Sequence, residues 1–383
     1  MYAQRYSLII AGLQLFIPLI VLFDWLFNLG IVQIQFGVYF KSLVTLIFFY
    51  IFISHRFPDF VFKKVLIYLI ILYILYSIFS DNIQGNLYIT ARILYWVLGA
   101  FAFYYFFKHD LISEKQLIRM LVTISVIAGV FTFVLMSRSE EHQNASAYLL
   151  LWCLPLLLHF NKSKLISVVI AFSMAAIVIT IKRGALVALI VSLVIYFVAR
   201  LRISERNISK LKVFINGLLF LALVGIILYL RWDLISERFS DRGGSGRDKL
   251  YSLIINNYMA GDILEVSFGN GINSVQRMTS LQSNDPNSVG VAAHSDWLQH
   301  LHDFGILGIL LMVSLHVGFI KLILFHAKFR TNTLPFLSMT YSIFLLSTIY
   351  SFILTTPDAI ILGINLALIS FETNQYSQNA GNS

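Results

Sequence analysis

Residues 164–203 have the sequence KLISVVIAFSMAAIVITIKRGALVALIVSLVIYFVARLRI, and this stretch decides the fold class. It contains two apolar runs, 165–181 and 184–200, which meet at Lys182 and Arg183. Each run approaches the roughly 20 apolar residues that a membrane-spanning helix needs. The stretch therefore predicts two antiparallel helices that cross a membrane, with a pair of cations at the turn between them.

Apolar runs of similar length recur along the whole chain. Of its 383 residues, 58% are hydrophobic and 12% are charged, which is about half the charged fraction of a soluble domain. This leaves too little polar surface for a water-facing globule, which excludes disordered, disulfide-rich secreted and ordinary soluble proteins. We therefore predict an all-α polytopic membrane protein with about twelve transmembrane helices. The apolar runs centre on residues 7–29, 38–54, 64–80, 88–107, 116–136, 146–160, 165–181, 184–200, 211–230, 305–325, 334–354 and 358–371.

The distribution of cations predicts the orientation in the membrane. With a cytoplasmic N-terminus, 17 Lys and Arg side chains fall in segments that face the cytoplasm, and only four fall in the short outer loops. This is the asymmetry that the positive-inside rule describes. The net charge of +9 is thereby explained by topology, and no nucleic-acid partner is expected.

The same topology divides the chain into four parts. We predict transmembrane helices one to nine in residues 1–230, an external loop domain in 231–304, helices ten to twelve in 305–371 and a disordered tail in 372–383. The external loop has nine acidic and six basic side chains, so it is not a polybasic lipid anchor. Within it, RDKLYSLIINNYM (247–259) predicts a short amphipathic helix, and QSNDPNS predicts a mobile segment.

Two groups of external cations are candidates for an anion site. Lys182 and Arg183 precede Gly184, and they either snorkel to lipid headgroups or bind phosphate through the arginine fork. The bend DRGGSGR carries Arg242 and Arg247 just before the amphipathic helix. Backbone amides and arginines at a helix N-terminus suit a diphosphate, although the bend can equally be a solvated turn.

A third external candidate is the histidine-rich segment that precedes the next span. It contains His294, Asp296, His300 and His302. The spacing matches no common zinc pattern, and adjacent residues do not generally form a hydrolase triad. A single histidine that acts as general base, or that positions the acceptor, is the simpler hypothesis.

Two weaker features complete the candidates. Gly269-Asn270-Gly271 is more typical of a turn than of a phosphate loop. Asp24 lies inside the first predicted span, and a carboxylate in a membrane span is a functional candidate by default. It can equally lie near the outer interface, because that span ends by Gly30.

Five segments, in their order and spacing, resemble the O-antigen polymerase and O-antigen ligase superfamily of bacterial inner-membrane glycosyltransferases. They are EEHQNASAYLLLWCLPLLL at the start of a span, KRGALVALIVSLVIYF with its Arg-Gly pair, SGRDKLYSLIINNY and FGNGINSV in the external loop, and AAHSDWLQHLHDFGILGIL. The similarity is strongest over residues 140–325. The family often has asparagine where this chain has Ser295, so the role of that neighbour is not transferred.

The resemblance implies a membrane glycosyltransferase fold of the GT-C kind in the bacterial inner membrane, with an active site that faces the periplasm. Members transfer a glycan from undecaprenyl diphosphate without a nucleotide-sugar donor, so we expect no cofactor and no metal ion. By this resemblance Arg183 and Arg247 form the diphosphate clamp, and His294 is the base or the acceptor-orienting residue. Three further residues are predicted to bind substrate: Lys182, Arg242 and Asp296.

Three functions follow from these predictions. A polymerase transfers the growing glycan to the next lipid-linked repeat unit, and we favour it because WLQHLHDFGILG is more similar to polymerases. A ligase of the same family transfers the glycan to lipid A core. A flippase for lipid-linked oligosaccharides fits the number of spans, but not the large external loop or the scarcity of mid-membrane charges. The expected partners are undecaprenyl-diphosphate-linked glycans, the lipid bilayer, a chain-length regulator and a flippase.

Overall fold

The computed structural model describes an all-helical chain. It covers residues 2–28, 30–79, 83–138, 145–180, 182–204, 247–282, 291–356 and 358–381, with scattered positions between 211 and 229. No β-strand occurs in these ranges, so the all-α prediction is confirmed for them. The helices are α1 (Tyr2–Asn28), α2 (Phe36–Ser54), α3 (Lys63–Ile78), α4 (Ile83–Lys108), α5 (Glu114–Arg138), α6 (Ala145–His159), α7 (Lys164–Ile179), α8 (Arg183–Ile203), α11 (Arg247–Met259), α12 (Ile263–Phe268), α13 (Ser274–Gln282), α14 (Asp296–Phe329), α15 (Leu334–Tyr350) and α16 (Ala359–Gly381).

Six of the helices in the described part of the chain are long and apolar enough to cross a membrane. They are α1, α2, α4, α5, α8 and α14, and α6, α7 and α15 are shorter apolar helices. The protein is therefore an α-helical membrane protein. The predicted span 211–230 falls almost entirely outside the described residues, and so does the segment QSNDPNS.

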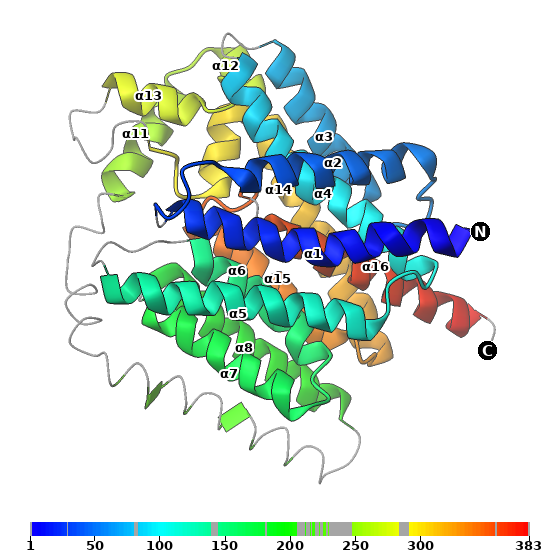
Figure 1. Cartoon of the computed structure of the whole chain (residues 1–383). Coiled ribbons are helices and arrows are strands. Elements are labelled where there is room, and N and C mark those ends of the chain that lie inside the picture. Colours follow the sequence, from blue (N-terminus) through cyan, green and yellow to red (C-terminus); the bar gives the residue numbers. More distant parts are fainter. Residues whose placement is uncertain are drawn as a thin grey trace.

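The stretch 164–203 forms the two helices that its apolar pattern predicts. The hydroxyl of Ser163 caps α7 by accepting a hydrogen bond from the backbone nitrogen of Ile166, at 3.3 Å. Lys182 is the N-cap residue of α8. The pair of cations thus lies at the turn between two antiparallel helices (Figure 1).

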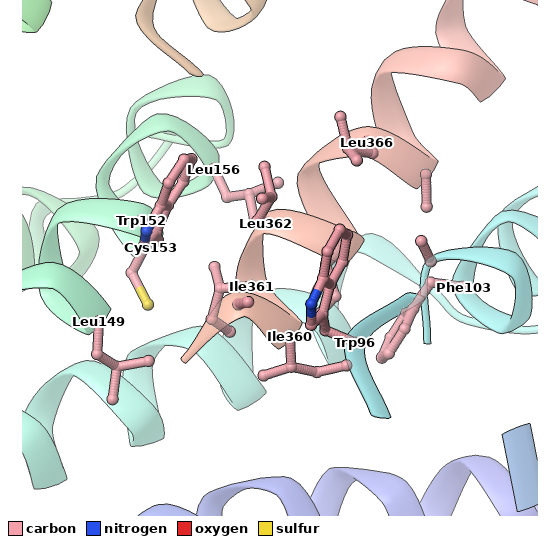
Figure 2. Packing of buried hydrophobic residues seen from close by; sticks show 14 of the residues in the cluster. Trp96, Phe103, Leu149, Trp152, Cys153, Leu156, Ile360, Ile361, Leu362 and Leu366 are labelled. Atoms are coloured by element: carbon pink, nitrogen blue, oxygen red, sulfur yellow. The ribbon is translucent and has the colours of Figure 1, made fainter. Parts of the chain in front are cut away.

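Helices α4 and α16 form the centre of the bundle, where small residues allow close packing. A Cβ on Gly363 of α16 would lie 2.6 Å from the carbonyl oxygen of Trp96 on α4, which only glycine accommodates without a shift. Trp96 is fully buried, and its indole nitrogen donates to the carbonyl of Leu354 at 2.7 Å. Figure 2 shows Trp96 on one side of α16, and Trp152 and Cys153 of α6 on the other side of that helix. The loop before α16 is therefore tied to the apolar core.

The two chain ends lie at one end of the bundle, and helices α11–α13 lie at the other. Figure 1 shows N and C together at the right, with α11 and α13 at the upper left. We call the end with α11–α13 the loop end. It has a small core of its own, in which Leu250 and Ile254 of α11 pack against Val275 and Met278 of α13 and against Ala293. The spacing of Leu250 and Ile254 is that of an amphipathic helix, so this prediction for residues 247–259 is confirmed.

Helix α14 consists of two helical segments that meet at a sharp kink. Gly305 has φ 61° and ψ −142°, values that lie outside the helical region. A Cβ on Gly308, one turn after the kink, would overlap the carbonyl group of His300. The segment Asp296–Phe304 therefore folds back against the start of the membrane-spanning part, at the boundary that the sequence predicts for residue 305.

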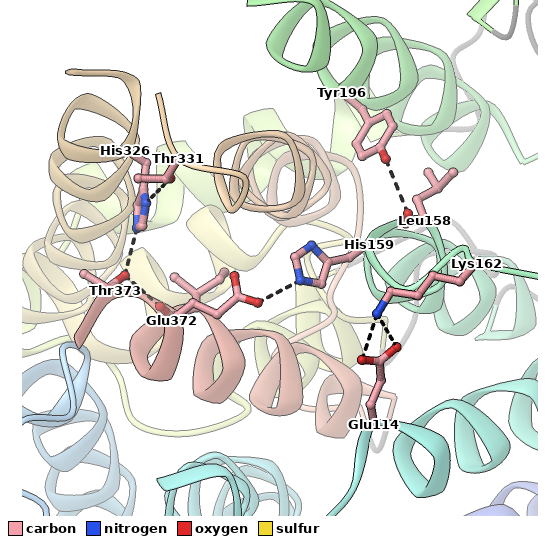
Figure 3. Close-up of polar contacts among 10 residues, drawn as sticks. Glu114, Leu158, His159, Lys162, Tyr196, His326, Thr331, Glu372 and Thr373 are labelled. Atoms are coloured by element: carbon pink, nitrogen blue, oxygen red, sulfur yellow. Dashed lines mark hydrogen bonds and ion pairs between the residues drawn. The ribbon is translucent and has the colours of Figure 1, made fainter. Parts of the chain in front are cut away.

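Polar side chains hold the end of α16 against its neighbours at the termini end (Figure 3). His159 of α6 bonds to Glu372 with Nε2 and Oε1 2.7 Å apart, and His326 of α14 bonds to Thr373 at 2.9 Å. Asn374 donates to the backbone oxygen of Asp59 at 2.7 Å. Because α16 continues to Gly381, the prediction of a disordered tail from residue 372 is wrong for the described residues.

Candidate functional site

Lys182 lies at the loop end, where the turn before α8 meets the start of α6. Its Nζ is 4.3 Å from the centroid of the Tyr148 ring, a cation–π contact. Burial lowers the pKa of Lys182 to about 7, and the positive charge of Arg247 adds to this effect, while Asp358 opposes it. The ammonium group of Lys182 therefore titrates near neutral pH, and a bound anion would favour its charged form.

Gly184, two residues later, is needed for packing. A Cβ at this position would lie 2.8 Å from the hydroxyl of Tyr148 and 2.8 Å from Cβ of Tyr350. Glycine thus lets the first turn of α8 approach α6 and α15, and the side chains of Tyr148 and Tyr350 fill the space beside it. Arg183, between Lys182 and Gly184, is the first residue of α8 and is half-buried.

Arg247 is the first residue of α11, and it connects the loop domain to the helix bundle. Its Nη1 donates to the carbonyl of Tyr350 at the end of α15, at 3.4 Å. The same guanidinium contributes to lowering the pKa of both Lys182 and His294. The first residue of α11 is therefore brought close to the turn before α8.

His294 lies just before α14 in a strained backbone conformation. Its φ of 51° is in the left-handed region, which costs a residue other than glycine on the order of 1–3 kcal/mol. The hydroxyl of Tyr251, on α11, donates to its carbonyl oxygen at 3.3 Å. Burial lowers the pKa of His294, and the charges of Arg247 and Lys182 lower it further. The imidazole is thus neutral at physiological pH and able to accept a proton.

Lys182, Arg247 and His294 therefore come together from three distant parts of the sequence; we call them the loop-end cluster. Each of the two cations lowers the pKa of the histidine. Of the other predicted residues, Arg183 is the sequence neighbour of Lys182, whereas Arg242 lies outside the described residues. The tyrosines at positions 148, 251 and 350 contact the cluster and were not predicted.

Asp296 has a different environment from the one that the sequence led us to expect. Its side chain is completely buried and accepts hydrogen bonds from the backbone nitrogens of Ile353, at 3.0 Å, and Leu354, at 3.3 Å. Its own backbone nitrogen donates to the carbonyl of Ser351 at 3.1 Å. Asp296 thus anchors the loop between α15 and α16 behind the cluster, so we revise its predicted role from substrate binding to positioning.

The neighbouring histidines have protein partners at both ring nitrogens. His300 contacts the backbone oxygen of Asp296 at 2.7 Å and the hydroxyl of Tyr73 at 3.3 Å. His302 contacts Ser274 at 2.7 Å and Asn257 at 2.9 Å. Within the described ranges, His, Cys, Asp and Glu side chains form no group of three that could hold a metal ion. These bonds give both histidines a structural role.

The Gly269-Asn270-Gly271 segment forms a turn that pairs with α14. The backbone nitrogen of Asn270 donates to the carbonyl of His302, and that of Gly271 donates to the carbonyl of Asp303, both at 2.9 Å. The Asp303 carboxylate accepts from the hydroxyl of Ser274 at 2.7 Å. The prediction of a turn is confirmed, and these two amides are not available to a phosphate.

Asp24 forms an ion pair that the sequence does not predict. Its Oδ2 lies 2.5 Å from Nζ of Lys41 on α2. Asp358, just before α16, is within electrostatic reach of Asp24, Lys41 and Arg92. These four charges are far apart in sequence, and each is isolated in an apolar run or beside one. The only sign of this group in the sequence is that each of the four charged residues lies in an apolar run or beside one.

Comparison of the whole chain with models of known protein families finds no match, and comparison with curated proteins finds none either.

Proposed function

We propose that the chain is a bacterial inner-membrane glycosyltransferase of the O-antigen polymerase kind. In this proposal about twelve GT-C-like transmembrane helices place the loop end at the periplasmic face. The donor is a glycan on undecaprenyl diphosphate, and the acceptor is the next lipid-linked repeat unit. The observation that carries the proposal is the convergence of Lys182, Arg247 and His294 at the end of the bundle that bears the external helices.

The chemistry of this cluster fits a displacement at a sugar diphosphate. The acceptor hydroxyl oxygen attacks the anomeric carbon of the donor glycan, and the bond from that carbon to the diphosphate oxygen breaks. Undecaprenyl diphosphate leaves with the bonding electrons, and its charge is neutralised by Lys182 and Arg247, with Arg183 beside them. The proton of the acceptor hydroxyl passes to the neutral imidazole of His294. The arginine fork suits the diphosphate oxygens in a way that a second lysine would not.

Two features support transfer over transport. The charges of the loop-end cluster are at the end of the bundle, whereas transporters generally place their substrate sites near the midplane. The histidine is neutral in the free protein because burial and the charges of Arg247 and Lys182 lower its pKa, and an anion bound to these cations would favour protonation of the imidazole. A flippase makes and breaks no glycosidic bond, so it needs no general base for an acceptor hydroxyl.

The experiment that tests the function uses the purified full chain in lipid nanodiscs with the lipid-linked repeat unit as the sole substrate. A ladder of longer lipid-linked glycans, formed equally well with EDTA, is the result expected of a polymerase. Product formation only after lipid A core is added would identify a ligase and overturn the polymerase proposal. Movement of the lipid across the bilayer without any new glycosidic bond would identify a flippase.

A further inference from the structure

A second charged site lies in the helix bundle, apart from the loop-end cluster. A cavity of about 270 Å³ is bounded by residues of α1, α2, α4, α5, α6 and α16 and by the loop before α16, and its charged lining is Asp24, Lys41, Arg92 and Asp358. A groove of about 320 Å³ adjoins it between α2 and α4. Lys41 and Arg92 line both spaces, so the groove and the cavity are continuous.

The groove presents an apolar surface. The hydroxyls of Ser42 and Thr45 donate to the backbone oxygens one turn earlier on α2, at 3.0 and 2.7 Å. Their hydrogen-bonding capacity is thus used within the helix. Leu46, which is 65% exposed, and Ala91 complete this wall. A groove of this kind, on the outside of a membrane helix bundle, accommodates a hydrocarbon chain.

The junction between groove and cavity is cationic. Lys41 is paired with Asp24 at 2.5 Å. The guanidinium of Arg92 lies 4.2 Å from the centroid of the Tyr88 ring, and its Nη2 donates to the hydroxyl of that tyrosine at 2.5 Å. None of the described carboxylates forms an ion pair with Arg92. The junction can therefore accept an anionic group.

Carboxylates line the cavity beside these cations. Asp24 and Asp358 line the cavity but not the groove. The lining as a whole has two positive and two negative charges, so it does not favour a free anion throughout. Carboxylates accept hydrogen bonds, and the hydroxyls of a sugar are suitable donors. The cavity thus suits an uncharged polyhydroxylated group next to the cationic junction.

The cavity is also connected to the loop-end cluster. Asp358 is within electrostatic reach of Lys182. Tyr148, whose ring contacts Lys182, is followed by Leu149, which lines the cavity. The loop before α16 continues this connection, because its residues Ile353 and Leu354 bind Asp296 beside the cluster. The two sites therefore share the start of α6 and one loop.

We propose that the groove and cavity form the site of the lipid-linked acceptor. The prenyl chain lies in the groove between α2 and α4, the diphosphate lies at Lys41 and Arg92, and the first sugar lies against Asp24 and Asp358. The order of apolar, cationic and carboxylate surfaces matches the order of these groups in such a lipid. The inference rests on the proposed function. It gives the donor and the acceptor separate sites on the helix bundle.

The test is photo-crosslinking of the full chain in nanodiscs of phosphatidylethanolamine and phosphatidylglycerol. The probe is undecaprenyl-diphosphate N-acetylglucosamine with a diazirine in the prenyl chain. We expect crosslinks on α2 and α4 that fall at least about tenfold in Leu46→Trp, whose side chain fills the groove. Leu43→Trp is the matched control, because Leu43 is also on α2 and 44% exposed but does not line the groove.

The outcomes separate failure of the inference from failure of the function. Crosslinks confined to segments around Lys182 and Arg247, unchanged in Leu46→Trp, would overturn the acceptor site and leave the glycosyltransferase proposal intact. If the wild type gave no crosslink and formed no polymer, both proposals would fail. Asp358→Asn adds a test of the sugar. It should weaken binding of this probe more than binding of undecaprenyl diphosphate, and equal effects would contradict recognition of the sugar by the carboxylate.

Discussion

The backbone of Gly269 lies directly against the backbone of Gly305. A Cβ on Gly269 would lie 2.5 Å from the carbonyl oxygen of Asp303, and a Cβ on Gly305 would lie 2.5 Å from the carbonyl oxygen of Val266. Both glycines also have positive φ angles, of 76° and 61°. The turn after α12 and the kink of α14 are therefore one interlocked unit, and this unit determines the direction of the segment that follows His294.

Gly305→Ala should strongly destabilise this unit. The positive φ alone costs a side chain on the order of 1–3 kcal/mol, and the overlap with Val266 adds to it. Gly30→Ala is the matched control, because Gly30 has φ 69° but no described atom lies within 4 Å of its added Cβ. The measurement is the thermal unfolding midpoint of each purified variant. Equal shifts in the two variants would show that the contact contributes nothing.

Asp296→Ala should lower stability as well as activity. The change leaves the backbone nitrogens of Ile353 and Leu354 without their acceptor, and an unpaired buried donor costs about 1–3 kcal/mol. Asp248→Ala, an exposed acid on α11, should change the unfolding midpoint very little. A stable Asp296→Ala protein with weakened donor binding would instead mean that this carboxylate contacts substrate.

Binding of undecaprenyl diphosphate should take up a proton near neutral pH. Lys182 has a pKa of about 7 in the free protein, and a bound anion raises it, so affinity should decrease as pH rises above 7. Calorimetry in buffers of different ionisation enthalpy measures the uptake. Lys182→Arg keeps a permanent charge and controls for protons taken up by the diphosphate itself. Uptake that is the same in both proteins would exclude Lys182 as the titrating group.

Cysteine labelling should place the loop end outside the cytoplasm. Ser280 of α13 and Asn332 between α14 and α15 are both exposed, and the native Cys153 is buried. In intact cells, Ser280→Cys should react with an impermeant thiol reagent, whereas Asn332→Cys should react only after permeabilisation. The reverse pattern would invert the orientation that the 17 inner and four outer cations predict.

The sequence predicts local structure well where one helix pattern is sufficient. Helix α11 matches the predicted residues 247–259, because its apolar spacing and its position after a glycine-rich bend are both local signals. The polar tail from residue 372 was predicted to be disordered, yet Glu372 and Thr373 are held by histidines of α6 and α14. Such partners lie hundreds or tens of residues away, and composition contains no signal for them.

The candidate site shows the same difference between features that local sequence predicts and features that depend on distant residues. Residue type and predicted topology indicate an anion site and a histidine base, and the resemblance selects Arg183, Arg247 and His294 for these roles. The structure adds Lys182 to Arg247 and His294. The packing role of Gly184 and the anchoring role of Asp296 depend on Tyr350 and Leu354, which belong to another part of the chain. Long-range packing therefore decides which polar residues face the cluster and which support it from behind.

The most direct test of the account measures donor binding and turnover separately in His294→Ala and Arg247→Ala. If His294 accepts the proton, His294→Ala should lower turnover by roughly 10²–10⁴ and leave undecaprenyl diphosphate binding nearly unchanged. Arg247→Ala should weaken that binding by roughly tenfold or more, because a charged hydrogen bond contributes about 1.5–3 kcal/mol. On acidification, wild-type kcat/KM should fall at a pH below the ordinary histidine range, because the pKa of His294 in the free protein is lowered. Equal loss of donor binding in both variants, with a wild-type rate that does not change with pH, would contradict the account.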